Sequence, residues 1–323
     1  MPYQLGHTGV LPARWGPPFK APNPSSAKST PDRLMSATRI DGKACGTALE
    51  ATLSARIAAL ESPPHLAVVI VGDDPASHVY VGAKERACER LGIRSTRVDI
   101  AGDADFAEVV ATVERLNADP DVNGILVQSP LPAGMDEVAI TDLISPSKDV
   151  DGFHATNLGR LVQGDASGLL PCTPAGVMEM LAFADVDLYA KRAVVIGRSR
   201  IVGMPQALLL AQKGADATVT IAHSRTADIA AVCREADVLI AAVGRPEMVR
   251  ADWVKPGATV IDVGVNRVED QSRERGWRLA GDVHPEVGEV AGALSPVPGG
   301  VGPMTIAMMM SNTVRATELQ QGS

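Results

Sequence analysis

The chain of 323 residues is long enough for two globular domains. Its 46% hydrophobic residues and mean hydropathy of +0.08 describe an ordinary globular protein, and its net charge of -8 argues against nucleic acid or an anionic membrane as the main partner. The four cysteines and six histidines are scattered, so we expect neither a metal site nor a disulfide framework, which suits a reducing cytoplasm.

The first stretch of the chain differs from the rest. It is rich in Pro, Gly and Ser and has neither a helical nor a strand period. It lacks the apolar core of a secretory signal, and its prolines are incompatible with an amphipathic mitochondrial presequence. We therefore expect residues 1–35 to form a disordered tail, with Met35 as a candidate natural start.

From Ile40 onward, helical and strand patterns alternate, which predicts an α/β protein with a mainly parallel sheet. In the first half the expected helices are 46–60, 74–92 and 105–119, and the expected strands are 66–72, 95–100 and 124–128. Asp74 is the expected cap of the second helix, Pro75 suits its first turn, and Gly92 ends it.

A second series of strands and helices follows. It is introduced by an expected helix at 172–184, with Thr173 as its cap and Pro174 in the first helical position. The expected strands are then 192–197, 217–223, 237–244 and 258–264, and the expected helices are 203–214, 226–236 and 303–320.

The last of these helices can pack back on the first domain. We therefore expect a discontinuous first domain, made of residues 36–172 and 303–323, and a Rossmann-like dinucleotide-binding domain at 173–302. A cleft between the two domains would then bind the ligands.

A nucleotide-binding turn is expected at "VVIGRSRIVGMP", residues 194–205, between a strand and a helix. Glycines permit a tight turn and a close backbone approach, and a helix N-terminus offers unpaired N–H groups and partial positive charge to a phosphate. The spacing is G-x(5)-G, however, and not G-x-G-x-x-G, so a purely structural turn is an alternative.

The end of the next strand favours NADP over NAD. The sequence "TIAHSRT" has no acidic residue where an NAD enzyme usually places one for the ribose 2′-hydroxyl. It offers His223, Ser224 and Arg225, and the preceding turn adds Arg198 and Ser199. Positive charge and hydroxyl groups therefore gather where a 2′-phosphate would bind, although a solvated loop arginine is an equal alternative for Arg225.

Tyr80 and Lys84, in "YVGAK", are four residues apart in an expected helix. Side chains at this spacing share one helix face, so the tyrosine hydroxyl and the lysine ammonium point into the same space. The alternative for such a pair is a solvated lysine beside a half-buried tyrosine.

Several longer motifs occur in an order typical of one family. They are "VGDDPASHVYVGAKERACERLGI", "GILVQSPLP", "KDVDGFHATNLGRL", "PCTPAGV", "VIGRSRIVGMP", "VIDVGVN", "GDV" and "PVPGGVGPMT". From about Ile40 to its end, the chain closely resembles the bifunctional methylenetetrahydrofolate dehydrogenase/methenyltetrahydrofolate cyclohydrolase family.

This resemblance implies two successive activities. The first is NADP-dependent oxidation of 5,10-methylenetetrahydrofolate to 5,10-methenyltetrahydrofolate, and the second is hydrolysis of that product to 10-formyltetrahydrofolate. Both belong to the one-carbon metabolism that supplies purine synthesis and formyl groups. The resemblance also implies a cytoplasmic homodimer joined through its nucleotide domains, with tetrahydrofolates, polyglutamylated ones among the candidates, as substrates.

The resemblance further implies individual roles. Tyr80 and Lys84 would lie in the folate cleft, with Gln128 in contact with Lys84. Asp151 would hold the pterin ring. The other residues implied on the substrate side are Val127, Ser129, Pro298, Gly299, Gly300 and Val301. Those implied on the cofactor side are Gly197, Arg198, Ser199, Ser224 and Val265. Ser129, Ser295 and His284 depart from the usual family pattern, which leaves local packing or substrate affinity open.

The two implied steps make different demands on the protein. Hydride transfer needs donor and acceptor carbons held close and aligned. Hydrolysis needs a base, and burial beside a cationic substrate would disfavour the ammonium form of Lys84. Gln128 can orient that amine without restoring its charge, and Tyr80 can position the substrate. Asp151 can accept paired hydrogen bonds from the pterin, with a turn cap as the alternative.

Two other functions stay open at this point. One is a different enzyme on the same scaffold, either a dehydrogenase without cyclohydrolase activity or an NAD-dependent oxidoreductase of another small substrate. The other is a non-catalytic nucleotide-binding or scaffolding module. Lys84 with Gln128 favours a hydrolytic enzyme, and the missing acid argues against NAD. We assign structural or solvated roles to Lys148, Asp149, Cys88, Met304, Met308, Met309 and Met310.

Overall fold

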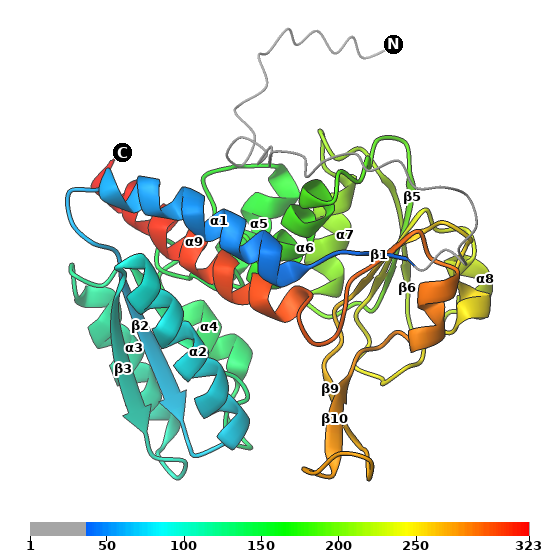
Figure 1. Cartoon of the computed structure of the whole chain (residues 1–323). Coiled ribbons are helices and arrows are strands. Elements are labelled where there is room, and N and C mark those ends of the chain that lie inside the picture. Colours follow the sequence, from blue (N-terminus) through cyan, green and yellow to red (C-terminus); the bar gives the residue numbers. More distant parts are fainter. Residues whose placement is uncertain (1–36, 323) are drawn as a thin grey trace, which may run out of the picture.

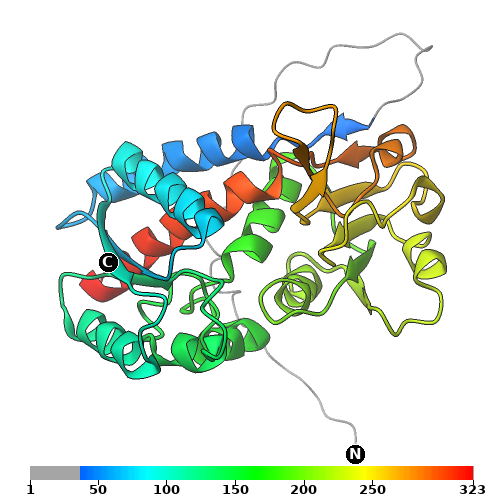
Figure 2. The ribbon, with the colours of Figure 1, turned by 90° about the horizontal axis from the view of Figure 1, so that it is seen from below.

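The computed structural model describes residues 37–322, with the side chain of Ala76 excepted. Within this range, two parallel sheets lie in separate lobes that are bridged by long helices (Figure 1; Figure 2). This confirms the expected α/β class. The tail expected at residues 1–35 lies outside the described residues.

The smaller sheet has three parallel strands in the order β3–β2–β4. They are β2 (His65–Val71), β3 (Arg94–Ile100) and β4 (Gly124–Val127). All seven residues of β2 are buried, because helices cover both faces of this central strand. One face packs against α2 (Pro75–Leu91) and α9 (Val301–Gln321), and the other packs against α3 (Phe106–Ala118) and α4 (Glu137–Leu143).

The larger sheet has six parallel strands in the order β1–β11–β8–β7–β5–β6. They are β1 (Thr38–Arg39), β5 (Arg192–Ile196), β6 (Thr218–Ala222), β7 (Val238–Ala241), β8 (Thr259–Asp262) and β11 (Ala293–Leu294). The crossovers from β5 to β6 and from β6 to β7 contain α7 (Gly203–Ala211) and α8 (Ile229–Cys233). Because β5 lies between β6 and β7, the strand order reverses at its carboxyl end, where Rossmann-like sheets bind nucleotides.

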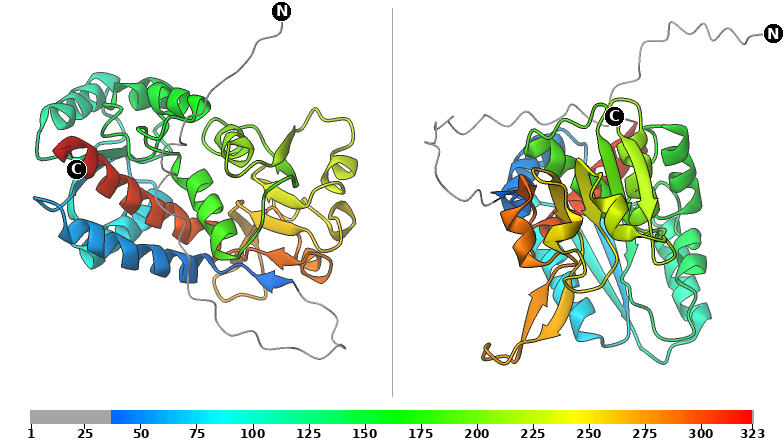
Figure 3. Two further views of the ribbon diagram at one scale, coloured as in Figure 1. Left: turned by 90° about the horizontal axis from the view of Figure 1, so that it is seen from above. Right: turned by 90° about the vertical axis from the view of Figure 1, so that its right-hand side faces the viewer.

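Three helices connect the lobes: α1 (Gly42–Ala58), α6 (Cys172–Phe183) and α9. Figure 1 and Figure 3 show α1 and α9 side by side. Their close approach depends on small residues, since a Cβ on Gly42 would collide with the carbonyl of Gly300. Helix α9 contributes Met304 to the core of one lobe and Met308 to that of the other.

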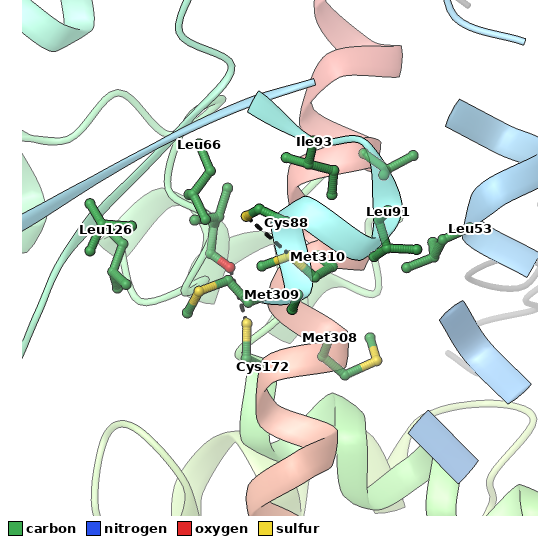
Figure 4. Packing of buried hydrophobic residues seen from close by; sticks show 14 of the residues in the cluster. Leu53, Leu66, Cys88, Leu91, Ile93, Leu126, Cys172, Met308, Met309 and Met310 are labelled. Atoms are coloured by element: carbon green, nitrogen blue, oxygen red, sulfur yellow. Dashed lines mark hydrogen bonds between the residues drawn. The ribbon is translucent and has the colours of Figure 1, made fainter. Parts of the chain in front are cut away.

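The methionines of α9 and the cysteines are core residues. Met304, Met308, Met309 and Met310 are buried, as expected. The four cysteines are free and buried, and Cys88 packs against Met310 beneath β2 (Figure 4). No helix in the described part of the chain is long and apolar enough to cross a bilayer.

The capping and turn residues of the sequence predicted some helix ends correctly and others wrongly. Helix α2 begins at Pro75 and is followed by Gly92 at φ +70°, as expected. Helix α1 begins earlier than expected, because the Asp41 carboxylate accepts hydrogen bonds from its first backbone N–H groups. The expected Thr173 cap is wrong: α6 already begins at Cys172, and the Thr173 hydroxyl instead pairs with that of Thr305.

Several elements had no sequence signal that we used. They are α4, α5 (Ala155–Gln163), the short strands β1 and β11, two 3-10 helices (Ala251–Trp253 and Pro285–Glu289), and the antiparallel hairpin of β9 (Asn266–Glu269) and β10 (Trp277–Ala280). The hairpin is rich in charge. It is stabilised where Arg267 and Arg275 stack on the ring of Trp277, at 4.5 and 4.1 Å from its centre.

Candidate active site

A buried lysine contacts an amide at the carboxyl end of the smaller sheet. Lys84, on α2, is only 7% exposed, and its Nζ donates a hydrogen bond of 2.8 Å to Oε1 of Gln128. Gln128 directly follows β4, and its backbone N–H donates to the carbonyl of Val69 in β2. The sheet ladder therefore fixes the backbone of the residue that holds the lysine.

The charges around Lys84 push its proton equilibrium away from the ordinary range. Burial lowers the pKa of Lys84, while Asp151 and Cys172 raise it. Burial raises the pKa of Asp151 to about 6, an effect that the Lys84 charge opposes and Asp149 strengthens. Burial disfavours the ammonium and the carboxylate alike, so it moves both pKa values toward neutrality, while the charge of each group opposes the shift of the other.

The turn that carries Asp151 is built by Asp149. The Asp149 carboxylate is buried and accepts hydrogen bonds from the backbone N–H groups of Gly152 and His154 and from Nδ2 of Asn157. Gly152 has φ +75°, and a Cβ there would collide with the backbone of Leu170. Asp149 is therefore structural.

Lys148 is also structural. Its Nζ donates to the carbonyls of Leu116, Asn117 and Asp119 at the end of α3, at 2.7–3.2 Å. It thereby satisfies carbonyl groups that a helix C-terminus leaves unpaired. This buried lysine has three backbone acceptors, whereas Lys84 has one side-chain acceptor.

Tyr80 and the "PGGV" loop line one cavity. Tyr80 is 46% exposed, and it lines a cavity of about 530 Å³ together with Pro298, Gly299, Gly300 and Val301. Gly299 has φ +105°, which favours glycine, and the loop leads directly into α9. Val265 lines the same cavity from the nucleotide side, so that both lobes contribute to its wall.

The remaining residues expected on the substrate side flank Gln128. Val127 is partly buried at the end of β4, whereas Ser129 is exposed. The Ser129 carbonyl accepts a hydrogen bond from Nε2 of Gln128, which fixes the orientation of the amide. The amide oxygen therefore faces Lys84.

The glycine turn after β5 is shaped for a close approach of backbone. Gly197 has φ +119°, and a Cβ on it would collide with the carbonyl of Ala242. A Cβ on Gly203 would collide with the backbone of Gly197. Neither glycine can be replaced without moving this turn, which leads directly into α7.

The polar residues at this edge fit NADP. Arg198, Ser224 and Arg225 are exposed beyond β5 and β6. The next acidic residue after β6, Asp228, caps α8 through the N–H of Ala231 and is not placed for a ribose. The Ser199 hydroxyl differs from expectation in one respect, since it accepts hydrogen bonds from the N–H groups of Val202 and Gly203 and so caps α7.

Two buried acids at the cofactor edge were not singled out from the sequence. Asp262 ends β8 and Asp282 follows β10, and both receive several backbone hydrogen bonds. Burial raises the pKa of Asp262 to about 7. Both acids stand beside glycines in the "VIDVGVN" and "GDV" motifs, and this spacing was the available signal.

The departures from the family pattern have local explanations. Ser295 is buried, and its Oγ accepts a hydrogen bond of 2.8 Å from the N–H of Asp262. His284 caps the 3-10 helix at Pro285–Glu289 through its Nδ1. Neither change disturbs the residues around Lys84.

Two other features of the surface lie apart from this site. A larger cavity of about 720 Å³ is lined by residues such as Arg39, Lys191 and Asp237, at the amino ends of the larger sheet's strands, and contains none of the expected site residues. Across residues 37–322, no cluster of three or more His, Cys, Asp or Glu side chains is arranged to hold a metal ion.

Comparison with known proteins shows one family over both lobes. Residues 40–151 match the model of the tetrahydrofolate dehydrogenase/cyclohydrolase catalytic domain, and residues 171–321 match that of its NAD(P)-binding domain. The bifunctional protein FolD of Acidiphilium cryptum is 56% identical over 283 residues, which are 87% of this chain and 98% of the relative. The corresponding protein of Cereibacter sphaeroides is 52% identical, with 87% and 95% covered.

Solved structures agree. The bifunctional methylenetetrahydrofolate dehydrogenase/cyclohydrolase FolD of Campylobacter jejuni superposes with a TM-score of 0.83 at 44% identity, covering 88% of this chain and 99% of that one. The enzyme of Trypanosoma brucei, solved with NADP cofactor and an inhibitor, gives a TM-score of 0.82 at 39% identity, with 88% and 98% covered. The chain therefore belongs to the tetrahydrofolate dehydrogenase/cyclohydrolase family.

Proposed function

We propose that the protein oxidises 5,10-methylenetetrahydrofolate with NADP⁺ and then hydrolyses the methenyl product to 10-formyltetrahydrofolate. The observation that carries this proposal is the buried Lys84–Gln128 pair. Tyr80, one helical turn from Lys84 on α2, lines the cavity to which both lobes contribute, whereas Lys84 and Gln128 are not among its lining residues. This places the enzyme in one-carbon metabolism, as a source of formyl groups for purine synthesis.

The dehydrogenase step depends on alignment. NADP⁺, when bound, supplies the hydride acceptor. The Gly197 turn and the N-terminus of α7 would hold its phosphates, and Arg198, Ser224 and Arg225 would favour its 2′-phosphate. Val265 and the 298–301 loop would keep the two ligands in contact within the cavity. The folate nitrogens stabilise the cation that forms, so this step needs no protein base.

The hydrolytic step needs a proton acceptor, and Lys84 fills this role. Its neutral amine accepts a proton from the water whose oxygen bonds to the methenyl carbon. The Lys84 ammonium then returns that proton to N5 as the carbon–N5 bond breaks and its electron pair goes to N5. The remaining hydroxyl proton leaves to solvent, and the formyl group stays on N10.

The neighbours of Lys84 support this cycle. Gln128 holds the amine through a neutral oxygen, which orients it without the charge that would trap its proton. Tyr80 positions the substrate from the cavity wall. Asp151, whose pKa burial raises to about 6, accepts hydrogen bonds from the pterin when ionised.

We also propose domain limits. Residues 36–172 and 303–323 form the folate-binding domain, and residues 173–302 form the NADP-binding domain. The packing of α9 against α1 and α2 supports the return of the chain to the first lobe. Two elements cross this division, since β1 pairs with β11 in the larger sheet and α6 packs against α7.

Basic residues at the cavity support the proposal that the substrates are polyglutamylated. Lys43, Arg86 and Arg90 line it, and Arg90 pairs with Glu50 at 2.7 Å. Lys43 and Arg86 have no ion-pair partner within residues 37–322, so they can attract the carboxylates of a glutamate tail. A KM that falls with each added glutamate, and does so less at high salt, would support this; a constant KM would contradict it.

We further propose a cytoplasmic homodimer joined through the NADP-binding domains. The free cysteines suit a reducing compartment. Strand β6 is an open edge of the larger sheet, and such an edge needs covering. Light scattering would then give twice the chain mass of 33.7 kDa, and a single chain mass would refute the dimer.

A coupled spectrophotometric assay tests the function. Purified protein is given methylenetetrahydrofolate with NADP⁺ or with NAD⁺, and methenyl formation and decay are followed. We expect much faster formation with NADP⁺, followed by enzyme-dependent decay. Equal rates with both cofactors would contradict the 2′-phosphate site, and no enzyme-dependent decay would remove the cyclohydrolase activity.

A further inference from the structure

Two buried carboxylates lie at the cofactor edge without a part in the chemistry above. Asp262 is 4% exposed at the end of β8, and Asp282 is fully buried two residues after β10. We propose that Asp262 and Asp282 are positioning residues for the dehydrogenase step, which hold the loops after β7 and β8 in the shape that the cofactor needs. This inference rests on the proposed function.

Asp282 organises the loop after β7. Its Oδ2 accepts hydrogen bonds from the N–H groups of Val243 and Gly244, at 2.7 and 2.9 Å. Its Oδ1 accepts from the N–H of Arg245 at 2.9 Å and from Nδ2 of Asn266 at 3.0 Å. Three successive backbone N–H groups form a concave site for an anion, and Asp282 fills this site from within the protein.

That loop supports the glycine turn. Residue 242 precedes the three N–H groups bound by Asp282, and its carbonyl lies where a Cβ on Gly197 would be. The two backbones are therefore in direct contact. A shift of the 243–245 loop would move the Gly197 turn, which is the part of the site that approaches the nucleotide phosphates.

Asp262 connects the loop after β8 to the same structure. Its Oδ1 accepts from the N–H groups of Gly264 and Asp282, at 3.1 and 2.8 Å, and its Oδ2 accepts from that of Val283 at 3.0 Å. The residues on either side of Gly264 are Val263 and Val265, and both line the cavity.

Glycines make room for the two carboxylates. A Cβ on Gly264 would collide with the Asp282 carboxylate, and a Cβ on Gly281 would collide with that of Asp262. Three backbone segments, at 243–245, 264 and 281–283, and the side chain of Asn266 therefore meet at the two acidic side chains.

A stabilising role alone does not explain this arrangement. Burying two acids close together is costly, and the cost is offset here by hydrogen bonds from backbone N–H groups of the loops at the cofactor edge. The oxygens of both acids accept hydrogen bonds from backbone N–H groups and from Asn266, so the acids act on the reaction through the loops. Asp262 also lines the cavity, but it is only 4% exposed. What these contacts determine is the position of the cavity wall on the nucleotide side.

The test compares the two activities of one variant. Asp282→Asn keeps the shape but places an NH₂ group against backbone N–H donors. We expect its Kd for NADP⁺, measured by calorimetry, to rise about 10-fold or more, with a matching rise in the KM for NADP⁺. Hydrolysis of supplied methenyltetrahydrofolate should stay within about twofold of the parent protein, because Lys84 lies on the other lobe.

Two further variants keep the test decisive if Asp282→Asn folds poorly. Asn266→Ala removes one contact of Asp282 and should weaken NADP⁺ binding about threefold, in the same direction. Asp149→Asn is the matched control, because Asp149 is a buried acid that organises a turn in the folate lobe. It should impair hydrolysis and leave the Kd for NADP⁺ unchanged.

Two results would overturn the inference. One is an unchanged Kd for NADP⁺ in both Asp282→Asn and Asn266→Ala. The other is a loss of both activities by the same factor in step with a lower Tm, which is what a purely structural role produces. If the parent protein binds NADP⁺ but has neither activity, the proposed function fails, and the calorimetric comparison still decides the role of Asp282.

Discussion

The carboxyl ends of the two sheets use buried charge in opposite ways. At the smaller sheet, Lys84 has one hydrogen-bond acceptor, the oxygen of Gln128, and an acid whose pKa is raised to about 6 stands nearby. At the larger sheet, the Asp282 carboxylate accepts four hydrogen bonds, three of them from backbone. Lys84 can release its proton without leaving several partners unpaired, whereas the Asp282 carboxylate holds three backbone N–H groups in place.

Within the folate lobe the same contrast separates two lysines. Lys84 and Lys148 are equally buried, at 7% and 8% exposed, but Lys148 donates to three carbonyls. Burial lowers the pKa of both. Burial alone therefore does not identify a proton carrier, and the number and kind of partners distinguish the two.

The largest expected effect comes from Lys84→Met. This change removes the proposed proton acceptor, so the hydrolysis rate should fall by about 10²–10⁴-fold, while the Kd for NADP⁺ stays the same. The change removes the cost of burying an ammonium but leaves the Gln128 oxygen and Asp151 without their partner, so the free energy of unfolding should change by less than about 1 kcal/mol. Methenyl decay and urea unfolding measure the two quantities. Full hydrolytic activity in the variant would assign the proton transfer to another group.

Lys148→Met should lower the stability of the protein and leave its hydrolytic activity intact. The methionine leaves three carbonyls at the end of α3 without their donor, so the free energy of unfolding should fall by about 2 kcal/mol. Hydrolysis by the folded fraction should persist. An equal loss of hydrolysis in both lysine variants, without a difference in stability, would erase the contrast between them.

Asp151→Asn tests whether the Asp151 charge raises the pKa of Lys84. Lys84 must be neutral to accept a proton, so hydrolysis at saturating substrate should rise as pH increases through its lowered pKa. The Asp151 carboxylate raises that pKa, and its removal should therefore shift the rising limb to lower pH. The KM for the folate should also increase. A shift of the rising limb to higher pH would contradict the conclusion that the Asp151 charge raises the pKa of Lys84.

The smallest expected effect concerns the rim of the larger sheet. Arg225→Ala should raise the KM for NADP⁺ by about 10-fold and leave that for NAD⁺ unchanged, because only NADP⁺ carries the 2′-phosphate. Arg192, which is exposed at the opposite end of the sheet and pairs with Glu235, provides the matched control as Arg192→Ala. Equal changes for both cofactors would make Arg225 a solvated loop residue.

Much of the architecture was predictable because local signals and burial coincide. The unbroken run "LAVVIV" predicts a strand covered on both faces, and β2 is one. Pro75 and Gly92 mark the ends of α2. The hairpin of β9 and β10 was missed, since its alternating charges carry no apolar pattern and its stabilising ring contacts are known only once the strands pair.

Some residues of the candidate site could likewise be predicted from the sequence, and others could not. Tyr80 and Lys84 could be paired from helical spacing, and the missing acid after β6 was visible in the sequence. For Asp282 the sequence offered only the neighbouring glycine in "GDV". Its role could not be predicted, because its partners are backbone groups of a loop some 40 residues earlier in the chain, and backbone donors leave no trace in the residue types. The Thr173 cap failed for a similar reason, since its hydroxyl found a partner on α9.

Helices α1 and α9 pack together although the ribosome makes them at different times. Residues 42–58 emerge from the ribosome early, but their neighbours at 301–321 follow only after the whole larger sheet has been made. The nucleotide lobe can therefore begin to assemble during translation, while the apolar flank of α1 waits for its cover. Until then that flank lacks its contacts with α9.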